Sequence, residues 1–300
     1  MIIHLIEQII KEGTFVIALG EVLWDCFPDG ARFGGAPANY SCSLAELMAS
    51  GSVRLLSAVG DDEQGHAAEQ ELLSHGVETS LLQHSSHPTG QVFVQTDSKG
   101  IASYRFAEHS AWDALQWNPE LEQAARECDA VCFGTLGQRK PESAEVIRRF
   151  VAETDSGCLR ILDLNLRAPW FDEDVIAASL ELCNVLKVNE EELCSLAAMY
   201  GFVGSAEEQL QQFCSHLRLR CMAVTQGDSG AALSDGNQFC SCPALPVVVR
   251  DTVGAGDAFA AAMTLGLLHQ EPLQTILESA TQAAAFVCTQ SGGTPHFPHV

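Results

Sequence analysis

The segment from Asp251 to Asp257, Asp-Thr-Val-Gly-Ala-Gly-Asp, carries the clearest chemical signal in the chain. Its two glycines widen the range of backbone conformations available to the segment. An alanine-rich run typical of a helix follows. The first amides of a helix lack partners within it and carry the positive end of its dipole, so this point suits an anion. Asp257 falls in that first turn, where its carboxylate would accept the proton of a hydroxyl that attacks a phosphoryl group. The alternative is that Asp257 only complements the helix dipole.

A second glycine-rich segment spans residues 34–39 and has the sequence Gly-Gly-Ala-Pro-Ala-Asn. Two adjacent glycines let a ligand approach the backbone closely, and Pro37 fits the first turn of a helix. Asn39 would then project toward the same ligand. On its own the segment indicates no more than the start of a helix.

Short apolar runs alternate with longer amphipathic stretches, which predicts βαβ units and a largely parallel sheet. The predicted strands span residues 14–19, 53–59, 90–95, 102–106, 129–133, 159–164, 184–188, 221–225, 230–234, 238–241 and 246–249. The predicted helices span residues 35–49, 63–75, 141–153, 173–182, 190–199, 206–217, 255–268 and 272–288. The runs at 90–95 and 102–106 flank Asp-Ser-Lys-Gly at 97–100, a hairpin signal. One main domain with a small antiparallel flap is therefore expected.

Ligands of open α/β sheets bind beyond the carboxyl ends of the strands. Small or polar residues follow six of the predicted strands: Gly20, Glu21 and Asp25; Gly60, Asp61 and Asp62; Gly134 and Thr135; Asp163, Asn165 and Arg167; Asn189 to Glu192; Thr225 and Gly227. Polar loops account for any one of these ends. All six together favour a long crevice lined by carboxylates, amides and one arginine.

Composition excludes several classes of function. The 300 residues contain 16 Lys and Arg against 39 Asp and Glu, a formal net charge of −23, which repels nucleic-acid backbones. Hydrophobic residues make up 47%, which excludes disorder, and no apolar run reaches the roughly 18 residues of a membrane span. The 12 cysteines form no C-x-x-C pair, and the first ten residues lack the basic start of a signal peptide. We therefore expect a cytoplasmic protein.

Motifs that are absent narrow the chemistry further. The sequence holds no G-x-x-x-x-G-K-[ST] and no G-x-G-x-x-G after a strand, so neither a Walker site nor a Rossmann cofactor site is expected. The H-R-D and D-F-G elements of protein kinases are missing as well.

Taken together, the segments resemble the ribokinase-like carbohydrate kinases of the phosphofructokinase-B type, over about residues 16–298. Residues 251–257 look like that family's C-terminal signature, and residues 34–39 look like its N-terminal signature. Asn189 with Glu192 resembles its N-x-x-E element, and Thr225, Gly227 and Gly230 resemble its T-x-G-x-x-G element. The resemblance implies a three-layer α/β/α sandwich around a mainly parallel sheet. It also implies a single domain, 1–300, with a small β-sheet lid built near residues 22–35 and 90–111.

The resemblance also implies ATP as phosphoryl donor, Mg²⁺ as required ion and a bound K⁺. It assigns Asp257 as catalytic base, with the backbone of Gly254, Ala255 and Gly256 as the anion hole. The implied sugar-binding residues are Asp25, Gly34, Gly35, Asn39, Arg105 and Arg167. The implied nucleotide-binding residues are Lys187, Asn189, Thr225, Gly227 and Gly230. The implied metal residues are Glu192, with Asn189, for Mg²⁺ through water, and Asp251, Thr252, Ser291 and Gly293 for the monovalent cation.

Within the family, residues 20–25, 33–39 and 163–167 look most like those of fructokinases, except that Leu164 stands where proline is usual. This predicts phosphorylation of a ketose, D-fructose first, at a primary hydroxyl. Tyr104 and Arg105, with Arg167, are also similar to 2-keto-3-deoxygluconate kinases, where arginines would meet a substrate carboxylate. Another sugar or riboside kinase and a non-catalytic sugar sensor remain alternatives. Related enzymes often pair their lids, so a homodimer through the lid is expected.

Overall fold

The computed structural model describes residues 13–96 and 102–298. Within them, nine strands form one sheet in the order β13-β12-β11-β10-β9-β8-β1-β4-β5. The bounds are β1 Phe15–Leu19, β4 Ser52–Gly60, β5 Leu82–Ser85, β8 Ala130–Phe133, β9 Leu159–Asp163, β10 Val185–Asn189, β11 Cys221–Thr225, β12 Ala231–Ser234 and β13 Phe239–Cys242. Seven of these strands run parallel to one another, namely β11, β10, β9, β8, β1, β4 and β5. Strands β12 and β13 add to one edge of the sheet in antiparallel pairing.

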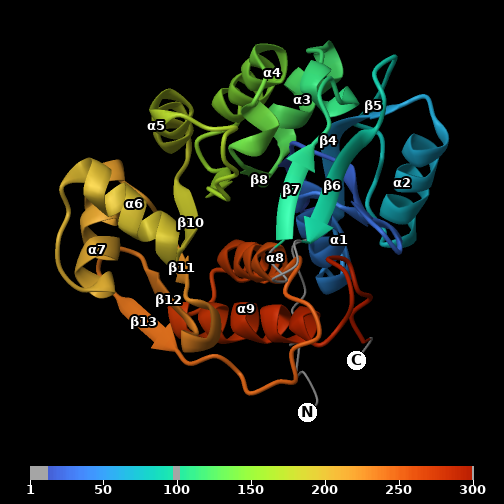
Figure 1. Ribbon diagram of the computed structural model, residues 1–300. Helices are drawn as coiled ribbons and strands as arrows, with labels where there is room; N and C mark the ends of the chain where they lie inside the picture. Colours follow the sequence, from blue (N-terminus) through green and yellow to red (C-terminus); the bar gives the residue numbers. More distant parts are fainter. Residues whose placement is uncertain (1–12, 97–101, 299–300) are drawn as a thin grey trace.

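Helices cover both faces of this sheet (Figure 1). One face packs against α1 Ala36–Leu47, α2 Glu63–Ser74, α8 Ala255–Leu268 and α9 Leu273–Cys288, and the other against α3 Pro119–Glu127, α4 Pro141–Ala152, α5 Glu173–Leu182, α6 Glu190–Tyr200 and α7 Ala206–Leu217. Alternation along β1 produces this arrangement, since Val16 and Ala18 join one core while Ile17 and Leu19 join the other. The predicted three-layer α/β/α fold is confirmed. No helix within the described residues is both long and apolar enough to cross a bilayer.

A second sheet has the strand order β3-β2-β6-β7, from β2 Leu23–Phe27, β3 Gly30–Gly34, β6 Gly90–Thr96 and β7 Ala102–Phe106. It draws on the two segments expected to form the lid. The predicted hairpin is present, because β6 and β7 pair antiparallel. Its turn, residues 97–100, lies outside the described residues. The indole of Trp24 donates a 3.0 Å hydrogen bond to the Gln64 carbonyl and so ties this sheet to α2.

The predicted strand at 246–249 is wrong. The segment is an irregular surface stretch, in which Val248 is 89% exposed, and it pairs with no described strand. Its valines favour extended backbone, but a strand also needs a partner and a face to bury. Conversely, β2, β3, β5 and α3 have no counterpart among the elements predicted from periodicity, although the family resemblance indicated β-structure near residues 22–35.

Candidate active site

The register of the central strands brings four polar side chains to one edge of the sheet. Asp163 at the end of β9 is opposite Lys187, and Asn189 at the end of β10 is opposite Thr225. The Lys187 amine lies 3.1 Å from both carboxylate oxygens of Asp163, and both side chains are buried. The Leu164 amide also donates a hydrogen bond to the Lys187 carbonyl. A proline at position 164 could not make this bond, because proline has no amide hydrogen.

Lys187 supplies a buried positive charge beneath the first turn of α8. Burial alone would lower its pKa, but the carboxylates of Asp163 and Asp257 raise it above the usual value. A Cβ added at Gly256 would lie 2.9 Å from the Lys187 amine, so the ammonium group approaches this backbone directly. The positive end of the helix and a permanent cation therefore meet at one place.

The N-terminus of α8 is left open by its sequence. Gly254 is the N-cap residue with φ +79°, and no side chain caps the helix. A Cβ at Gly254 would lie 2.4 Å from the Gly293 carbonyl oxygen, so this position requires glycine on two grounds. With no capping side chain in the way, the amides that begin α8 can receive an anion.

Asp257 lies in the first turn of α8 and is partly buried at the cavity wall. Its Oδ2 accepts a 2.8 Å hydrogen bond from the Asn39 amide nitrogen. Burial and the neighbouring Asp163 raise the pKa of Asp257 to about 6, although the Asn39 bond and Lys187 oppose that rise. The carboxyl group is therefore mostly ionised at neutral pH, yet far more basic than an ordinary aspartate.

A cavity of about 610 Å³ joins these groups to the second sheet. The sequence-predicted residues that line it are Asp25, Gly35, Asn39, Arg167, Lys187, Asn189, Thr225, Thr252, Gly254, Gly256 and Asp257. Leu23, Val92 and Phe106 of the second sheet add an apolar wall. The cavity thus has a polar floor at the strand ends and a partly apolar roof.

Residues 19–299 match the sequence model of a protein family, described as pfkB family carbohydrate kinase. The chain belongs to this family.

Curated relatives cover almost the whole kinase. It is 29% identical to the fructokinase of Klebsiella pneumoniae, over 94% of this chain and 95% of that one. It is 27% identical to fructokinase-2 of Oryza sativa subsp. japonica, over 96% and 92%. Among solved structures, an uncharacterised sugar kinase of Pyrococcus horikoshii in complex with ATP superposes with a TM-score of 0.78 at 25% identity, covering 93% of this chain and 94% of that chain.

Asp25, Gly34 and Asn39, three of the predicted sugar-binding residues, lie together at one end of the kinase's cavity. A Cβ at Gly34 would lie 3.0 Å from Asp25 Oδ2 and 3.9 Å from Asn39 Oδ1, so the glycine leaves room between the two polar groups. Burial raises the pKa of Asp25 to about 6, against the opposing effect of Arg167 and Arg32. Asn39 Oδ1 is buried and has no hydrogen-bond partner among the described residues. An unpaired buried acceptor of this kind fits a hydroxyl donor.

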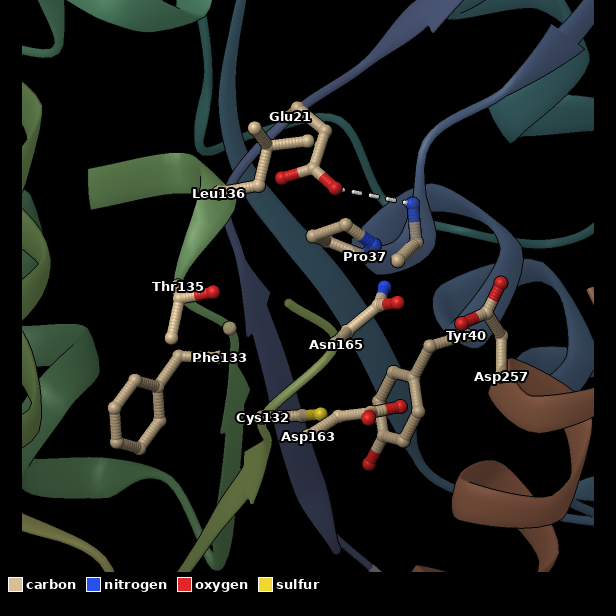
Figure 2. A pocket seen from close by; sticks show the side chains of 12 residues that line it. Glu21, Pro37, Tyr40, Cys132, Phe133, Thr135, Leu136, Asp163, Asn165 and Asp257 are labelled. Atoms are coloured by element: carbon tan, nitrogen blue, oxygen red, sulfur yellow. Dashed lines mark hydrogen bonds between the residues drawn. The ribbon is translucent and has the colours of Figure 1, made fainter. Parts of the chain in front are cut away.

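Glu21 lines the kinase's cavity, as its place after a predicted strand indicated, although the family resemblance assigned it no role. Its carboxylate accepts a 3.2 Å hydrogen bond from the Ala36 amide at the start of α1, and burial raises its pKa to about 7. Glu21 lines the main cavity and also a recess of about 20 Å³ behind it, together with Asp163 and Asp257 (Figure 2). Its place directly after a buried strand was the available signal.

Asn165 is a second residue that was expected at the crevice without an assigned role. It lines both the cavity and the recess, and its φ of +41° is unusual for a residue other than glycine. Backbone in this region is typical of functional sites.

Glu192, a predicted metal residue of the kinase, lies behind the cavity wall rather than on it. Glu192 closes a capping box at the start of α6, where its carboxylate accepts the amides of Asn189 at 2.9 Å and Leu166 at 2.8 Å. Burial raises the pKa of Glu192. Glu192 therefore orients Asn189, which does line the cavity.

The loops expected to hold a monovalent cation lie together. Asp251 accepts amide hydrogen bonds of 3.1 Å from Val253 in its own loop and from Gly292 in the other. Gly293 packs against Asn39, since a Cβ there would lie 2.8 Å from the Asn39 amide nitrogen. Ser291 is exposed at the surface of the second loop.

Three predicted residues are set apart from the cavity wall. Gly227 and Gly230 form the turn between β11 and β12, and Gly230, with φ +104°, would place a Cβ 2.0 Å from the Cys242 carbonyl oxygen. Packing therefore requires glycine at position 230. Arg105 is exposed on β7 and stacks its guanidinium 4.6 Å over the Phe93 ring.

Proposed function

We propose that this kinase transfers the γ-phosphoryl group of ATP to a primary hydroxyl group of D-fructose, with Asp257 as the base. The observation that carries the proposal is the position of Asp257, at the open N-terminus of α8 and in the same cavity as Asp25. The curated relatives named fructokinases support a ketose as acceptor. The ATP complex of the Pyrococcus horikoshii sugar kinase supports ATP as donor.

The sugar hydroxyls would donate hydrogen bonds to Asp25, because an ionised carboxylate can only accept them. Asp25, when ionised, accepts hydrogen bonds from two neighbouring hydroxyls. Asn39 contributes beside them by holding Asp257 through its 2.8 Å hydrogen bond. These contacts point one hydroxyl toward Asp257, which takes up its proton at Oδ1 as the oxygen attacks phosphorus.

The phosphoryl group is held by backbone amides and a cation rather than by a large set of side chains. The uncapped start of α8 offers the amides of Gly254, Ala255 and Gly256, of which that of Ala255 also donates a 3.3 Å hydrogen bond to the Thr252 carbonyl oxygen. This helix start and the Lys187 ammonium group, which lies beneath Gly256, would face the phosphoryl group. Both are fixed before the reaction, so they stabilise the charge on the transferred group without rearrangement.

Mg²⁺ fits the donor set at this end of the cavity, because Asn189 and Glu192 offer oxygen atoms, which this ion prefers. When bound with ATP it neutralises phosphate charge. Because Glu192 already accepts two amides, we assign it to holding Asn189 and to contact with the ion through water. Thr225 and Gly227 would contact the nucleotide, and Gly230 would shape the adjoining turn.

A monovalent cation, K⁺, would bind between the loops that Asp251 connects, with Thr252, Ser291 and Gly293 nearby. Carbonyl and carboxylate oxygens are suitable ligands for K⁺. Replacing K⁺ with N-methyl-D-glucamine in the assay should then lower turnover several-fold. Equal rates in the two salts would exclude this role.

The second sheet would act as the lid over the sugar, within a single kinase domain. Its edges are β3 and β7, and unpaired edges of this kind can pair with a second copy. We therefore propose a homodimer formed through the lids. Light scattering tests this, and a monomer at assay concentration would refute it.

The deciding experiment measures ADP release with ATP, Mg²⁺ and K⁺ across D-fructose, 2-keto-3-deoxygluconate, ribose, tagatose, glucose and a nucleoside, beside an Asp257→Ala variant. Turnover on fructose that disappears in the variant supports the proposal. A strong preference for the keto-acid would replace the substrate but keep the reaction. If no sugar gives ADP release while sugar binding is retained, the alternative of a non-catalytic sugar sensor is supported.

The positions of two arginines favour a neutral sugar over an acidic one. Arg167 lines the cavity near Asp25, whose carboxylate would repel a substrate carboxylate. Arg105 is not among the residues that line the cavity. Arg105→Ala and Arg167→Ala should therefore affect fructose and 2-keto-3-deoxygluconate alike. A loss confined to the keto-acid would instead favour the acidic substrate.

A further inference from the structure

Two histidines and a glutamate gather at the end of α1 that lies away from the cavity. Glu46 is in the last turn of α1, His75 is the C-cap of α2, and His296 comes from the C-terminal segment. Since α1 begins at the active site and rises about 1.5 Å per residue, the cluster lies roughly 15 Å from the catalytic groups. None of the three side chains has a part in the proposed reaction.

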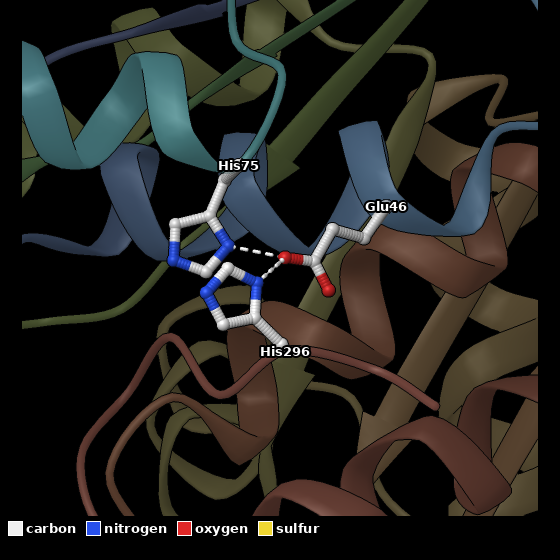
Figure 3. Close-up of side chains that lie close together, drawn as sticks. All are labelled: Glu46, His75 and His296. Atoms are coloured by element: carbon white, nitrogen blue, oxygen red, sulfur yellow. Dashed lines mark hydrogen bonds and ion pairs between the residues drawn. The ribbon is translucent and has the colours of Figure 1, made fainter. Parts of the chain in front are cut away.

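The three side chains present their ligand atoms to one point (Figure 3). The Nδ1 atom of His296 lies 2.5 Å from Glu46 Oε1, and the Nδ1 atom of His75 contacts the same oxygen. The two imidazole rings stack with centroids 4.2 Å apart and planes 21° from parallel. All three ligand atoms lie within 4.8 Å of one another.

The surroundings favour a cation. Two helices, α1 and α2, end here, and the end of each carries the negative pole of its dipole. Neither last turn contains a basic residue. The Glu46 side chain is only 10% exposed, so its negative charge is added to two negative poles with little water to screen it.

Glu46 is held in a form that suits a ligand. Its carboxylate accepts hydrogen bonds from His75, His296 and the Phe297 amide. The Phe297 amide donates to Oε2 at 2.6 Å and so fixes the carboxylate while Oε1 faces both histidines. A hydrogen-bonded second oxygen is typical of carboxylates that bind metals.

We propose that Glu46, His75 and His296 form a binding site for a divalent first-row transition metal ion, with Zn²⁺ as the expected occupant. Two imidazoles and a carboxylate suit Zn²⁺, whereas Mg²⁺ and Ca²⁺ prefer oxygen ligands alone. Water would complete a four-coordinate shell. The His296 side chain is 67% exposed, so an ion reaches the site from solvent and a small shift of this side chain makes room for it.

The site would be structural, because it links the C-terminal segment to the ends of α1 and α2. An ion that binds only the folded protein stabilises it according to its concentration above the dissociation constant. At a Zn²⁺ concentration about 100 times that constant, the midpoint of thermal unfolding should rise by about 5 °C. This readout is independent of catalysis.

The test is a titration of EDTA-stripped, dialysed kinase with ZnCl₂ in competition with a chromophoric chelator. Wild type should bind one Zn²⁺ per chain, and His296→Ala and Glu46→Gln should each bind it at least about tenfold more weakly. The matched control is His84→Ala, which removes an exposed histidine 3.8 Å from the Glu69 carboxylate. It should bind Zn²⁺ and gain thermal stability as wild type does.

Two results would overturn the proposal. If wild type takes up no Zn²⁺ in the competition, the cluster is only a hydrogen-bonded link between segments. If His296→Ala binds Zn²⁺ as tightly as wild type and gains the same thermal stability, the ion sits elsewhere. Because His296 is exposed, this variant should fold, and its far-UV circular dichroism verifies that.

Discussion

The amide nitrogen of Asn39 donates a 2.8 Å hydrogen bond to Oδ2 of Asp257, a residue 218 positions further along the chain. This bond leaves Oδ1 of Asp257 available to a substrate hydroxyl. It also turns the Asn39 carbonyl oxygen, which has no partner among the described residues, toward other donors. One side chain therefore positions the proposed base and keeps an unpaired, buried acceptor beside it.

Replacing Asp257 with Ala should lower kcat by about 10²–10⁴-fold, because the attacking hydroxyl loses its base. The dissociation constant for fructose, measured by calorimetry, should change little. Asp174→Ala removes an exposed acid from the first turn of another helix, α5, and serves as control. Near-normal turnover of the Asp257 variant would contradict its assignment as base.

The pH profile should report the raised pKa values of Asp257 and Asp25, each about 6. Both carboxyls act in their ionised form, so kcat/KM for fructose should fall as the pH drops below about 6, with a slope approaching two. Ordinary aspartates would place this fall about two units lower. Asn39→Ala removes a bond that lowers the pKa of Asp257, so the fall should move to higher pH. A profile that stays flat down to pH 5 would disagree with these values.

Gly34→Ala should raise the KM for fructose by about tenfold, because the new methyl group would stand 3.0 Å from Asp25 Oδ2 and displace that carboxylate. The KM for ATP should stay the same. Gly157→Ala is the control, since a Cβ there meets nothing within 4 Å. Equal rises in both KM values would point to a general disturbance of the fold.

Lys187→Met should destabilise the protein by about 3–5 kcal/mol, because it leaves Asp163 buried without its partner. The double variant Asp163→Asn with Lys187→Met removes both charges and should recover most of that stability. Turnover should remain low in both variants, since the cation beneath Gly256 is gone. Denaturant titration and the coupled assay give the two readouts, and recovered activity in the double variant would exclude a role for Lys187 in phosphoryl transfer.

Glu21→Gln should make stability less dependent on pH. The pKa of Glu21 is about 7 in the folded protein and near 4.5 when unfolded, so the folded state binds the proton more tightly. Stability of the wild type therefore falls as the pH rises from 4.5 to 7, by about 3 kcal/mol from this group. The variant should match wild type at pH 4 and exceed it at pH 8 in urea denaturation, whereas exposed Glu63→Gln should show no such trend. A difference that does not grow with pH would refute the assignment.

Much of the fold follows from periodicity, and the exceptions have physical causes. The central strands and most helices were predicted to within about two residues, because their apolar runs are buried on both faces. Strands β2 and β3 were indicated only by the family resemblance and not by periodicity, because they are short, mixed in polarity and mostly half-buried or exposed. Helix α3 had a signal in Asn118, whose side chain caps it, followed by Pro119 at the first position.

The candidate site was less predictable, because it depends on strand register. The resemblance indicated Asp257 and Lys187, but no local pattern shows that Lys187 pairs with Asp163. The burial that raises the pKa of Glu21 is likewise a property of the assembled protein. The loop hydrogen bond from Gly292 to Asp251 joins segments 41 residues apart and has no signature in either.

The contact between Gly254, Gly293 and Asn39 has a consequence for how the enzyme is made. Asn39 and Asp25 leave the ribosome well before Asp257 and Gly293, since Asn39 and Asp257 are 218 positions apart. A chain that has emerged only as far as β13 thus holds the proposed sugar-binding residues without the proposed base or anion site. The proposed site is complete only when α8 and the loop at Gly293 have both emerged and packed against α1.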